Sequence, residues 1–343
     1  MAMQPREGAE QPATPPRARF APGELRAVLQ RYPLGAVHAL RELIGGAPQS
    51  PKAVARTDAG TVVIKRRVGQ GGREALEVTS RVQARAAEQG VPTPVVVRPI
   101  GQMNFVLVMG EHAYEVAGFV PGQAYRGDPR AAAAAGAALA KLHRIDLPHR
   151  ERAALPTRDR ATEDRVMAAL DAMAHSNPAL TGVAFELAAA WVWAEESMAA
   201  AGAPTGPIGV VHGDFHGGNT LYNGSTLAGV IDFDRAAVAN QLDELASAAV
   251  WFSLESIGLS GQLRLPQEGS LRAFLRAYIV AAELTATNVG SLPARMTRTL
   301  VEHAAASTPA QRSTEMLARV AAVARWIRAH ADETVRATLP VSR

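Results

Sequence analysis

The chain has 343 residues, a length typical of two compact domains. It is 48% hydrophobic and 20% charged, so it can bury a sizeable core and is not disordered as a whole. It contains no cysteine, which excludes disulfide scaffolds, thiolate metal sites and cysteine nucleophiles.

The net charge of +4 is unevenly distributed, with +8 over residues 1–150 and −4 over residues 151–343. The excess arginines are scattered without a lysine-rich run, and only 5% of the residues are aromatic, which argues against nucleic-acid binding. This uneven distribution of charge instead favours an anionic ligand in the first half of the chain and a neutral or cationic ligand in the second half.

The first twenty residues are polar and proline-rich, so we expect a disordered tail over residues 1–20. They lack the apolar stretch of a secretory signal. No apolar run elsewhere approaches the roughly 18 to 20 residues that span a bilayer. We therefore expect a cytoplasmic protein that does not associate with a membrane.

Strand-like patterns dominate residues 21–120, which we assign to an N-terminal domain. A short helix is expected to begin at Pro22, and a second over 73–89 ends at Gly90, a typical C-terminal stop. The predicted strands, the first two of which form a hairpin around a turn ending in Gly60, cover residues 53–56, 61–67, 104–109 and 114–120.

Helical patterns dominate residues 121–343, which we assign to a C-terminal domain. Asp128 is expected to cap, and Pro129 to open, an alanine-rich helix that runs to about His143. Further helices are predicted near residues 161–174, 184–201, 271–286, 294–306 and 311–331. The fold class is therefore α+β, with a small antiparallel sheet in one domain and mostly helices in the other.

One strand-rich island interrupts the helical domain, with the sequence VVHGDFHGGNTLYNGSTLAGVIDFD over residues 210–234. Predicted strands at 208–211 and 227–231 bracket it, and the second pairs with 220–222 in a hairpin. Asp214 follows one strand and Asp232 ends another. Side chains in such places are held by a rigid scaffold and remain open to a ligand.

These residues are suited to a particular chemistry. Asp214 and Asn219 offer a carboxylate and an amide oxygen, hard ligands that suit Mg²⁺ better than zinc, and Asp232 supplies a second carboxylate nearby. An aspartate that can accept a hydroxyl proton, beside an asparagine and an aspartate on a metal, is the minimal equipment of a kinase-type phosphotransferase. The alternative is a polar turn between two strands.

The segments HGDFHGGN and VIDFD resemble the motif pair of the aminoglycoside phosphotransferase and choline kinase superfamily. This superfamily is the small-molecule branch of the protein-kinase-like fold, and the resemblance covers roughly residues 35–255. It implies a bilobal fold, with nucleotide binding in the N-terminal domain and the catalytic loop and acceptor site in the helical domain. It also implies ATP and Mg²⁺ as cofactors.

The resemblance also implies the role of each motif residue. Asp214 would be the catalytic base, and Asn219 and Asp232 would be ligands of Mg²⁺. His212 would hold the catalytic loop, and Asp243, in the segment QLDELA, would support that loop from the helix behind it.

His212 and His216 form an H-x3-H pair, which raises the alternative of a zinc site. Such a site would require a third protein ligand and a helix to space the histidines. Because both lie on a glycine-rich loop, we expect structural hydrogen bonds instead.

Lys65 is the expected phosphate-binding lysine, because the segment VVIK resembles the V-A-I-K strand of kinases. Its glutamate partner is assigned to Glu77, although the position at the family's usual spacing is occupied by Thr79. The phosphate-covering loop is expected over residues 45–50, where Ser50 can add a hydroxyl. By resemblance, adenine would bond to the carbonyl of Gly118 and the amide of Val120.

The acceptor is expected to be a small molecule with a hydroxyl group, bound near residues 151–205 and 255–310. The negative charge of this region favours an amine-bearing alcohol, such as an aminoglycoside or an amino sugar. The acids concerned are Glu163, Asp164, Glu186, Glu195, Glu196 and Glu255.

Several alternatives remain open at this point. The segment FVPG, and the segment DELA followed by Trp251, are similar to homoserine-kinase-type members, which favours a metabolic homoserine or choline kinase. A non-catalytic kinase-like scaffold would bind nucleotide without turnover. A protein kinase is disfavoured because the H-R-D, D-F-G and A-P-E signatures are absent. The oligomeric state and the choice between ATP and GTP are not predicted.

Overall fold

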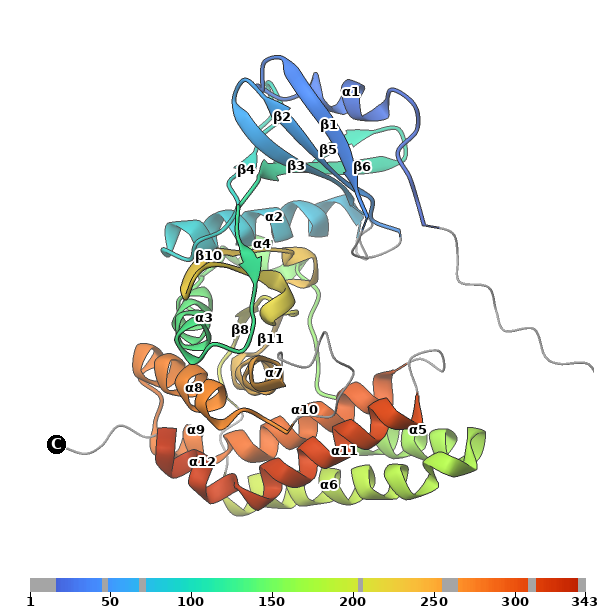
Figure 1. The fold of residues 1–343 in the computed structure, drawn as a ribbon, viewed down its shortest axis with the longest axis vertical. Helices are drawn as coiled ribbons and strands as arrows, with labels where there is room; N and C mark the ends of the chain where they lie inside the picture. The colour runs from blue at the N-terminus through green and yellow to red at the C-terminus, as the bar shows by residue number, and fades with distance from the viewer. Residues whose placement is uncertain are drawn as a thin grey trace, which may run out of the picture. The chain divides into compact units, whose positions relative to one another are not determined.

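The computed structural model describes residues 17–44, 49–67, 72–202, 206–254, 265–307 and 313–338 (Figure 1). The chain divides into two compact units, which we call the first unit (1–70 and 97–119) and the second unit (71–96 and 120–343). Most of the predicted tail, the glycines of the predicted phosphate-covering loop, and Glu255 lie outside the described residues.

The first unit contains a six-stranded sheet with the order β1-β2-β3-β6-β4, in which β5 also pairs with β6. Its strands are β1 (Val37–Leu43), β2 (Lys52–Thr57), β3 (Gly60–Arg67), β4 (Val96–Val97), β5 (Leu107–Met109) and β6 (His112–Gly118). The pairs β1–β2, β2–β3, β3–β6 and β5–β6 are antiparallel, and β2 and β3 form the predicted hairpin. The antiparallel sheet expected from the sequence is therefore present.

Alternating side chains of the sheet form the core of the first unit. Ala53 and Ala55 of β2, and Val62 and Ile64 of β3, are buried together with the apolar face of helix α1 (Glu24–Leu29). Glu24, at the start of α1, accepts hydrogen bonds from Arg66 and Tyr114, which attach the helix to β3 and β6.

Helix α2 (Gly72–Glu88) belongs to the second unit, although the sequence analysis placed it in the N-terminal domain. Its buried face, which includes Val78, Val82 and Ala86, is part of the large core of the second unit. It packs against the turn η3 (Phe233–Arg235) and helix α4 (His149–Ala154). Amphipathic spacing predicts that such a helix buries one face, but not which unit buries it.

The remaining helices of the second unit surround one hydrophobic core. They are α3 (Pro129–Leu142), α5 (Glu163–Ser176), η1 (Pro178–Leu180), α6 (Thr181–Ala200), α7 (Gln241–Leu254), α8 (Glu268–Ala282), α9 (Ala286–Gly290), α10 (Leu292–Ala306), α11 (Thr314–Ala329) and α12 (Ala331–Thr338). Helix α10 packs against α6, α7 and α11, and α3 packs along α8 (Figure 1). The predicted start of α3 is present, because Asp128 accepts a hydrogen bond from the amide of Arg130 at 2.9 Å.

The strand-rich island contains two small antiparallel sheets. The island itself supplies β8 (Ile208–Val211), η2 (Gly217–Asn219), β9 (Thr220–Asn223) and β10 (Thr226–Val230), and the strands β7 (Gln123–Ala124) and β11 (Ala237–Asn240) from outside it complete the sheets. Strand β8 pairs with β11, and β9 pairs with both β10 and β7. The ends of β8 and β10 therefore lead directly into the two motif loops.

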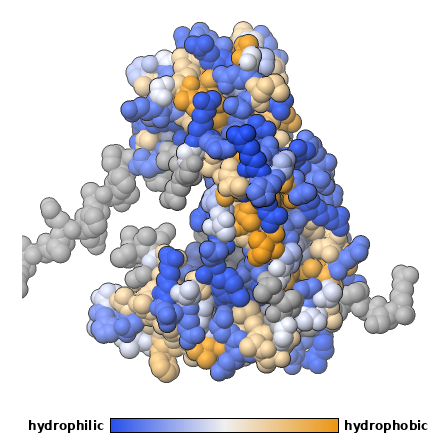
Figure 2. All heavy atoms as spheres, turned by 180° about the vertical axis from the view of Figure 1, so that it is seen from behind, coloured by the Kyte–Doolittle hydropathy of each residue, from blue (hydrophilic) through white to orange (hydrophobic). Residues whose placement is uncertain are grey.

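The helices within the described ranges include none that is long and apolar enough to cross a membrane. Figure 2 shows one face of the molecule, on which hydrophilic residues prevail and hydrophobic residues gather in small groups. The exposed large hydrophobic side chains are spread along the sequence, from Ile44 through Met103 to Phe185.

Candidate active site

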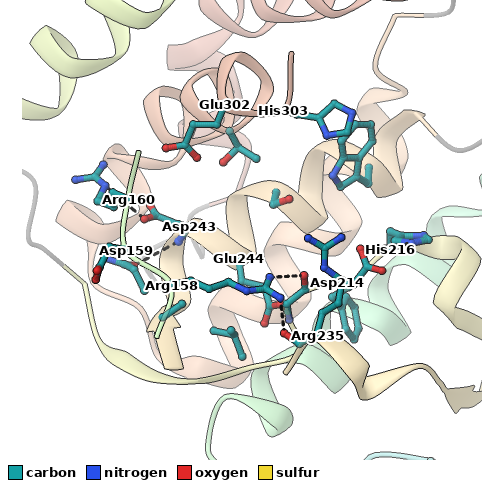
Figure 3. Close-up of a pocket in the computed structure, with 18 residues that line it drawn as sticks. Arg158, Asp159, Arg160, Asp214, His216, Arg235, Asp243, Glu244, Glu302 and His303 are labelled. Atoms are coloured by element: carbon teal, nitrogen blue, oxygen red, sulfur yellow. Dashed lines mark hydrogen bonds and ion pairs between the residues drawn. The ribbon is translucent and has the colours of Figure 1, made fainter. Parts of the chain in front are cut away.

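Asp214 lies on a tight turn that begins where β8 ends. The turn depends on Gly213, whose φ of +77° is unfavourable for other residues. A Cβ atom on Gly213 would also lie 2.0 Å from the backbone oxygen of Arg235, so only glycine fits. The turn leaves the Asp214 side chain partly exposed in the wall of a cavity (Figure 3).

Asp214, Asn219 and Asp232 are neighbours in the structure. The amide nitrogen of Asn219 donates to the backbone oxygen of Asp214 at 2.9 Å and to its Oδ2 at 3.3 Å. The backbone oxygen of Asn219 accepts a hydrogen bond from the amide of Ile231 at 2.9 Å, which brings Asp232 next to it. Both side-chain bonds of Asn219 use its nitrogen, so the amide oxygen is left for another ligand.

Asp232 adopts a left-handed backbone conformation, with φ of 66° and ψ of 61°. It is one of two described residues other than glycine with positive φ. Aspartate tolerates this region better than most residues, but the conformation still costs energy. Such strain is typically retained where a side chain must point in a functional direction.

His212 links the two motif loops, because it lies in the first and bonds to the second. Its Nε2 donates to the backbone oxygen of Ile231 at 3.1 Å, and its ring contacts Phe215 and Phe233. Complete burial lowers the pKa of His212, so the ring is neutral. Its Nδ1 has no hydrogen-bond partner within the described ranges.

The carboxylate that supports the loop of Asp214 is Glu244, at the start of α7. It accepts hydrogen bonds from the amides of His212 at 2.9 Å and Gly213 at 2.5 Å. His143 donates to it at 2.8 Å, and the other nitrogen of that ring bonds to the hydroxyl of Tyr278 at 2.6 Å. Burial alone would raise the pKa of Glu244, but these hydrogen bonds outweigh it and lower the pKa.

The sequence analysis assigned this support to Asp243, and the structure corrects it. Asp243 lies one position earlier on the same helix and therefore faces in another direction. Its carboxylate pairs with Arg295 at 2.5 Å and lies 3.5 Å from Arg160. The segment DELA places two acids side by side, and sequence spacing alone did not show which one faces the loop.

The cavity beside Asp214 has a volume of about 620 Å³, and the described residues that line it all belong to the second unit. Trp251 and His303 form one part of its wall, with their rings edge to face at 4.9 Å between centroids. Its charged lining comes from separate segments of the second unit (Figure 3): Arg158, Asp159, Arg160, Asp214, Arg235, Asp243, Glu244 and Glu302.

Glu302, in the same wall, has a carboxyl group whose pKa is raised. Burial, with a contribution from the nearby Asp243 carboxylate, raises the pKa of Glu302 to about 7. It does so although Arg298 donates to the Glu302 carboxylate at 2.7 Å. The charge of the cavity therefore changes near neutral pH.

The residues predicted to bind nucleotide fall in both units. Lys65 is buried on β3, opposite Glu115 of β6, and Ser50 is buried just before β2. Gly118 ends β6 in the first unit. The remaining two, Glu77 and Val120, belong to the second unit.

Glu77, the predicted partner of Lys65, has an ion-pair partner within its own helix, α2. The carboxylate of Glu77 lies 3.3 Å from the guanidinium of Arg81. Thr79, at the family's usual spacing for this acid, donates its hydroxyl to the backbone oxygen of Leu76. The Thr79 hydroxyl therefore bonds within its own helix, and Thr79 has no charge with which to pair a lysine.

Sequence reasoning missed three residues that the structure places at the site. Glu244 and Glu302 lie on helices whose buried faces could not be assigned to the site from periodicity. Arg158 lies on an irregular segment between α4 and α5, and it donates to backbone carbonyls of both motif loops. No sequence pattern predicts a contact between a side chain and backbone oxygens so far away in the chain.

The fold and this site together define a phosphotransferase of the protein-kinase-like class. The chain matches the family described as Phosphotransferase enzyme family over residues 39–286, and it belongs to that family. The predicted phosphotransferase family and enzyme class are thereby confirmed, and the solved structures described below share the predicted fold class. Comparison of the sequence with curated proteins gives no match.

Several solved structures share the fold. An amicoumacin kinase in complex with AMP-PNP, Ca²⁺ and Ami is 14% identical, with a TM-score of 0.59 and coverage of 90% of this chain and 92% of that chain. An aminoglycoside phosphotransferase from Alicyclobacillus acidocaldarius is 16% identical, with a TM-score of 0.57 and coverage of 94% of this chain and 100% of that chain. An ethanolamine kinase from Plasmodium vivax is 13% identical, with a TM-score of 0.56 and coverage of 90% of this chain and 85% of that chain. At these identities the likeness shows the fold.

Proposed function

We propose that this chain transfers the γ-phosphoryl group of ATP, with Mg²⁺, to a hydroxyl group of a small molecule. The observation that carries the proposal is the junction of Asp214, Asn219 and Asp232, linked through the Asn219 side chain and the backbone bond from Ile231 to Asn219. A binding scaffold would not require a carboxylate base beside an acceptor-sized cavity.

In this proposal Asp214 is the catalytic base. Its carboxylate accepts the proton of the acceptor hydroxyl as the new oxygen–phosphorus bond forms. The hydrogen bond from Asn219 to Oδ2 orients the carboxylate, and Glu244 fixes the turn that carries it. Most of the rate enhancement would come from holding the hydroxyl in line with the phosphorus atom.

Asn219 and Asp232 fit a magnesium ion by the chemistry of their donors. An amide oxygen and a carboxylate are hard ligands, and the ion usually completes its shell with phosphate oxygens and water. Such sharing is consistent with the finding that no cluster of three or more acidic, histidine or cysteine residues forms a metal site within the described ranges. When bound, the ion would neutralise phosphate charge.

The proposed nucleotide-binding residues are those named from the sequence. Lys65 would pair with phosphate oxygens, and Glu77 would orient that lysine. Ser50 would contribute a hydroxyl to the phosphates. The backbone oxygen of Gly118 and the amide of Val120 would bond to adenine. The support for these roles is the resemblance of the strand and hinge segments to kinases.

We further propose an amine-bearing acceptor. Asp159 is exposed in the cavity wall and makes no hydrogen bond or ion pair in the described part of the chain, so its charge is available. Glu302 adds negative charge above neutral pH. One of the similar structures is an ethanolamine kinase, and ethanolamine combines an amine with a hydroxyl.

One observation favours a second candidate, a metabolic kinase of homoserine type. Arg235 is exposed in the same cavity, and its guanidinium makes no hydrogen bond or ion pair with any residue the structure describes. A free cation beside Asp214 would suit an acceptor that carries a carboxylate as well as an amine.

A transfer assay tests both candidates. ATP labelled at the γ-phosphorus is incubated with the chain, Mg²⁺ and alcohols that include aminoglycosides, ethanolamine, choline, L-homoserine and 3-aminopropan-1-ol. The last two differ only by a carboxylate. We expect label on at least one hydroxyl. Tight ATP binding without transfer to any alcohol would instead favour the non-catalytic scaffold.

Arg235→Gln separates the two acceptor classes. If the acceptor carries a carboxylate, this change should raise its KM about tenfold or more, because a charge-assisted hydrogen bond is lost. The KM of an acceptor without a carboxylate should be unaffected. Equal effects on both would remove the homoserine-type candidate.

A further inference from the structure

We propose that Arg158 is a positioning residue that joins the loop of the catalytic base to the loop of the metal ligand, an inference that rests on the proposed function. Its Nη1 donates to the backbone oxygen of Gly213 at 2.8 Å. Its Nη2 donates to the backbone oxygen of Arg235 at 2.7 Å. One guanidinium thus bridges the residue before Asp214 and the turn after Asp232 (Figure 3).

The segment around Arg158 is held by the small sheet behind the site. The amide of Arg158 donates to the backbone oxygen of Val238 at 2.9 Å, and the amide of Val238 donates to that of Pro156 at 2.9 Å. Thr157 forms a parallel bridge with Val238. Residues 156–158 therefore extend the β8–β11 sheet, so that Arg158 starts from a rigid position.

The geometry of the contact requires an arginine. The two carbonyl oxygens converge on one side chain, and only a guanidinium offers two parallel donors in a fixed plane. A lysine could donate to either oxygen but has no preference for holding both at a fixed separation. A neutral amide such as glutamine is too short and has a single donor group.

The two loops approach each other most closely beside this guanidinium, in addition to the bonds that Ile231 makes with His212 and Asn219. A Cβ atom on Gly213 would lie 2.0 Å from the oxygen of Arg235 and 2.8 Å from Nη1 of Arg158. Without the guanidinium, two carbonyl dipoles would face the same point and repel each other. The loops would then move apart at Gly213 and Arg235, and Asp214 would shift relative to Asp232.

The charges around Arg158 are consistent with this role. Burial, with the nearby Arg235, lowers the pKa of Arg158, while Glu244 and Asp214 favour its charged form. Since the partners of Arg158 are neutral carbonyls, its positive charge remains available to these two carboxylates. The guanidinium therefore stabilises the site in two ways, by geometry and by charge.

Two rival roles make different predictions. Arg158 also lines the cavity, so it could bind the acceptor directly. Loss of that contact would raise the acceptor KM. Arg158 could instead stabilise only the fold, and its loss would then lower the melting temperature without changing the turnover of the folded enzyme.

The test compares Arg158→Gln and Arg158→Lys with Arg165→Gln, a control on the exposed side of α5, outside the cavity. Amide hydrogen exchange of residues 212–216 and 233–236 is measured on the full chain, together with kcat, KM and melting temperature. We expect Arg158→Gln to speed exchange in both loops about tenfold or more, because a bridge of two hydrogen bonds is lost.

The kinetic result should follow the exchange result. We expect kcat of Arg158→Gln to fall about 100-fold, because a small misplacement of the base is costly. The KM for ATP and the KM for the acceptor should both stay within about threefold of wild type. Arg158→Lys should be intermediate, and added guanidinium ion should restore part of the turnover of Arg158→Gly. If Arg158→Gln does not fold, Arg158→Lys carries the same comparison.

Three results would overturn the inference. One is unchanged exchange in both loops with kcat near wild type. The second is a raised acceptor KM with unchanged kcat, which would assign Arg158 to acceptor binding. The third is a lower melting temperature alone. A wild type that transfers no phosphoryl group to any acceptor would overturn the proposed function, whereas loop exchange would still report on the bridge.

Discussion

At the scale of single residues, Glu302 connects the cavity to pH. Its folded-state pKa of about 7 exceeds its usual value of 4.5, so the folded chain holds this proton over a range in which the unfolded chain has lost it. The contribution of Glu302 to stability therefore falls as pH rises from about 4.5 to about 7, and it is constant above that.

Glu302→Gln should remove this dependence, because glutamine does not titrate and can still accept the hydrogen bond from Arg298. We expect the melting temperature of the variant, relative to wild type, to rise between pH 4.5 and pH 7. Thermal unfolding monitored over this pH range checks the prediction. A difference that does not vary with pH would contradict it.

Asp232 supports a second prediction at this scale. Asp232→Asn keeps a residue that tolerates the left-handed backbone, with φ of 66°, but removes the carboxylate charge. We expect the variant to lose the dependence of nucleotide affinity on Mg²⁺, measured by calorimetric titration with an ATP analogue. Asp171→Asn, on the exposed face of α5, is the control. A variant with the wild-type Mg²⁺ dependence would remove Asp232 from the metal site.

The roles of individual residues were predictable to different degrees. The loop glycines and acids of HGDFHGGN and VIDFD could be found because their spacing along the chain determines where they lie. Glu244 could not be separated from Asp243, because neighbouring acids on a helix differ only in the direction they face. Arg158 contacts backbone atoms far away in sequence, which leave no pattern.

At the scale of elements, the close packing of α3 on α8 depends on Gly136. A Cβ atom there would lie 2.2 Å from the backbone oxygen of Phe274. Gly136→Ala should therefore destabilise the chain by about 1–3 kcal/mol, although alanine is the better helix former. Gly182→Ala in α6 is the matched control, because a Cβ atom there meets nothing within 4 Å.

Chemical denaturation of both variants measures this difference. The control should be neutral or more stable by up to about 1 kcal/mol, since it gains helix propensity without a clash. Equal stability of the two variants would show that α8 moves away from α3 without cost.

The positions of helices and hairpins were predicted better than the surfaces against which they pack. The cap at Asp128, the β2–β3 hairpin and the β9–β10 hairpin follow from local sequence signals. The unit that holds α2 does not, because its apolar stripe specifies burial but not the surface that buries it. This assignment requires contacts that are distant in sequence.

At the scale of the whole molecule, the second unit is discontinuous in sequence, since it includes residues 71–96. A fragment of residues 121–343 lacks α2 and would expose the core surface that Val78, Val82 and Ala86 cover. We expect this fragment to unfold at a lower denaturant concentration than the full chain, or without a cooperative transition. Circular dichroism during denaturation would show this, and an unchanged midpoint would contradict it.

Enzyme class was accessible from sequence at this scale, but acceptor identity was not. The paired motifs are specific enough to indicate a phosphotransferase before any contact is known. The acids that line the cavity, such as Asp159 and Glu302, come from segments with no shared motif, and many other acids lie on solvated helix faces. Only the folded chain shows which charges line the cavity that we propose for the acceptor.

The central claim is that Asp214 acts as the base for phosphoryl transfer, and Asp214→Asn tests it most directly. Asparagine keeps the shape of the side chain and an oxygen for the bond from Asn219, but it cannot accept the proton. We predict that kcat falls about 100- to 10,000-fold while the affinity for the Mg²⁺–nucleotide complex stays within about twofold. A variant that retains wild-type turnover, or that loses nucleotide binding instead, would contradict the account.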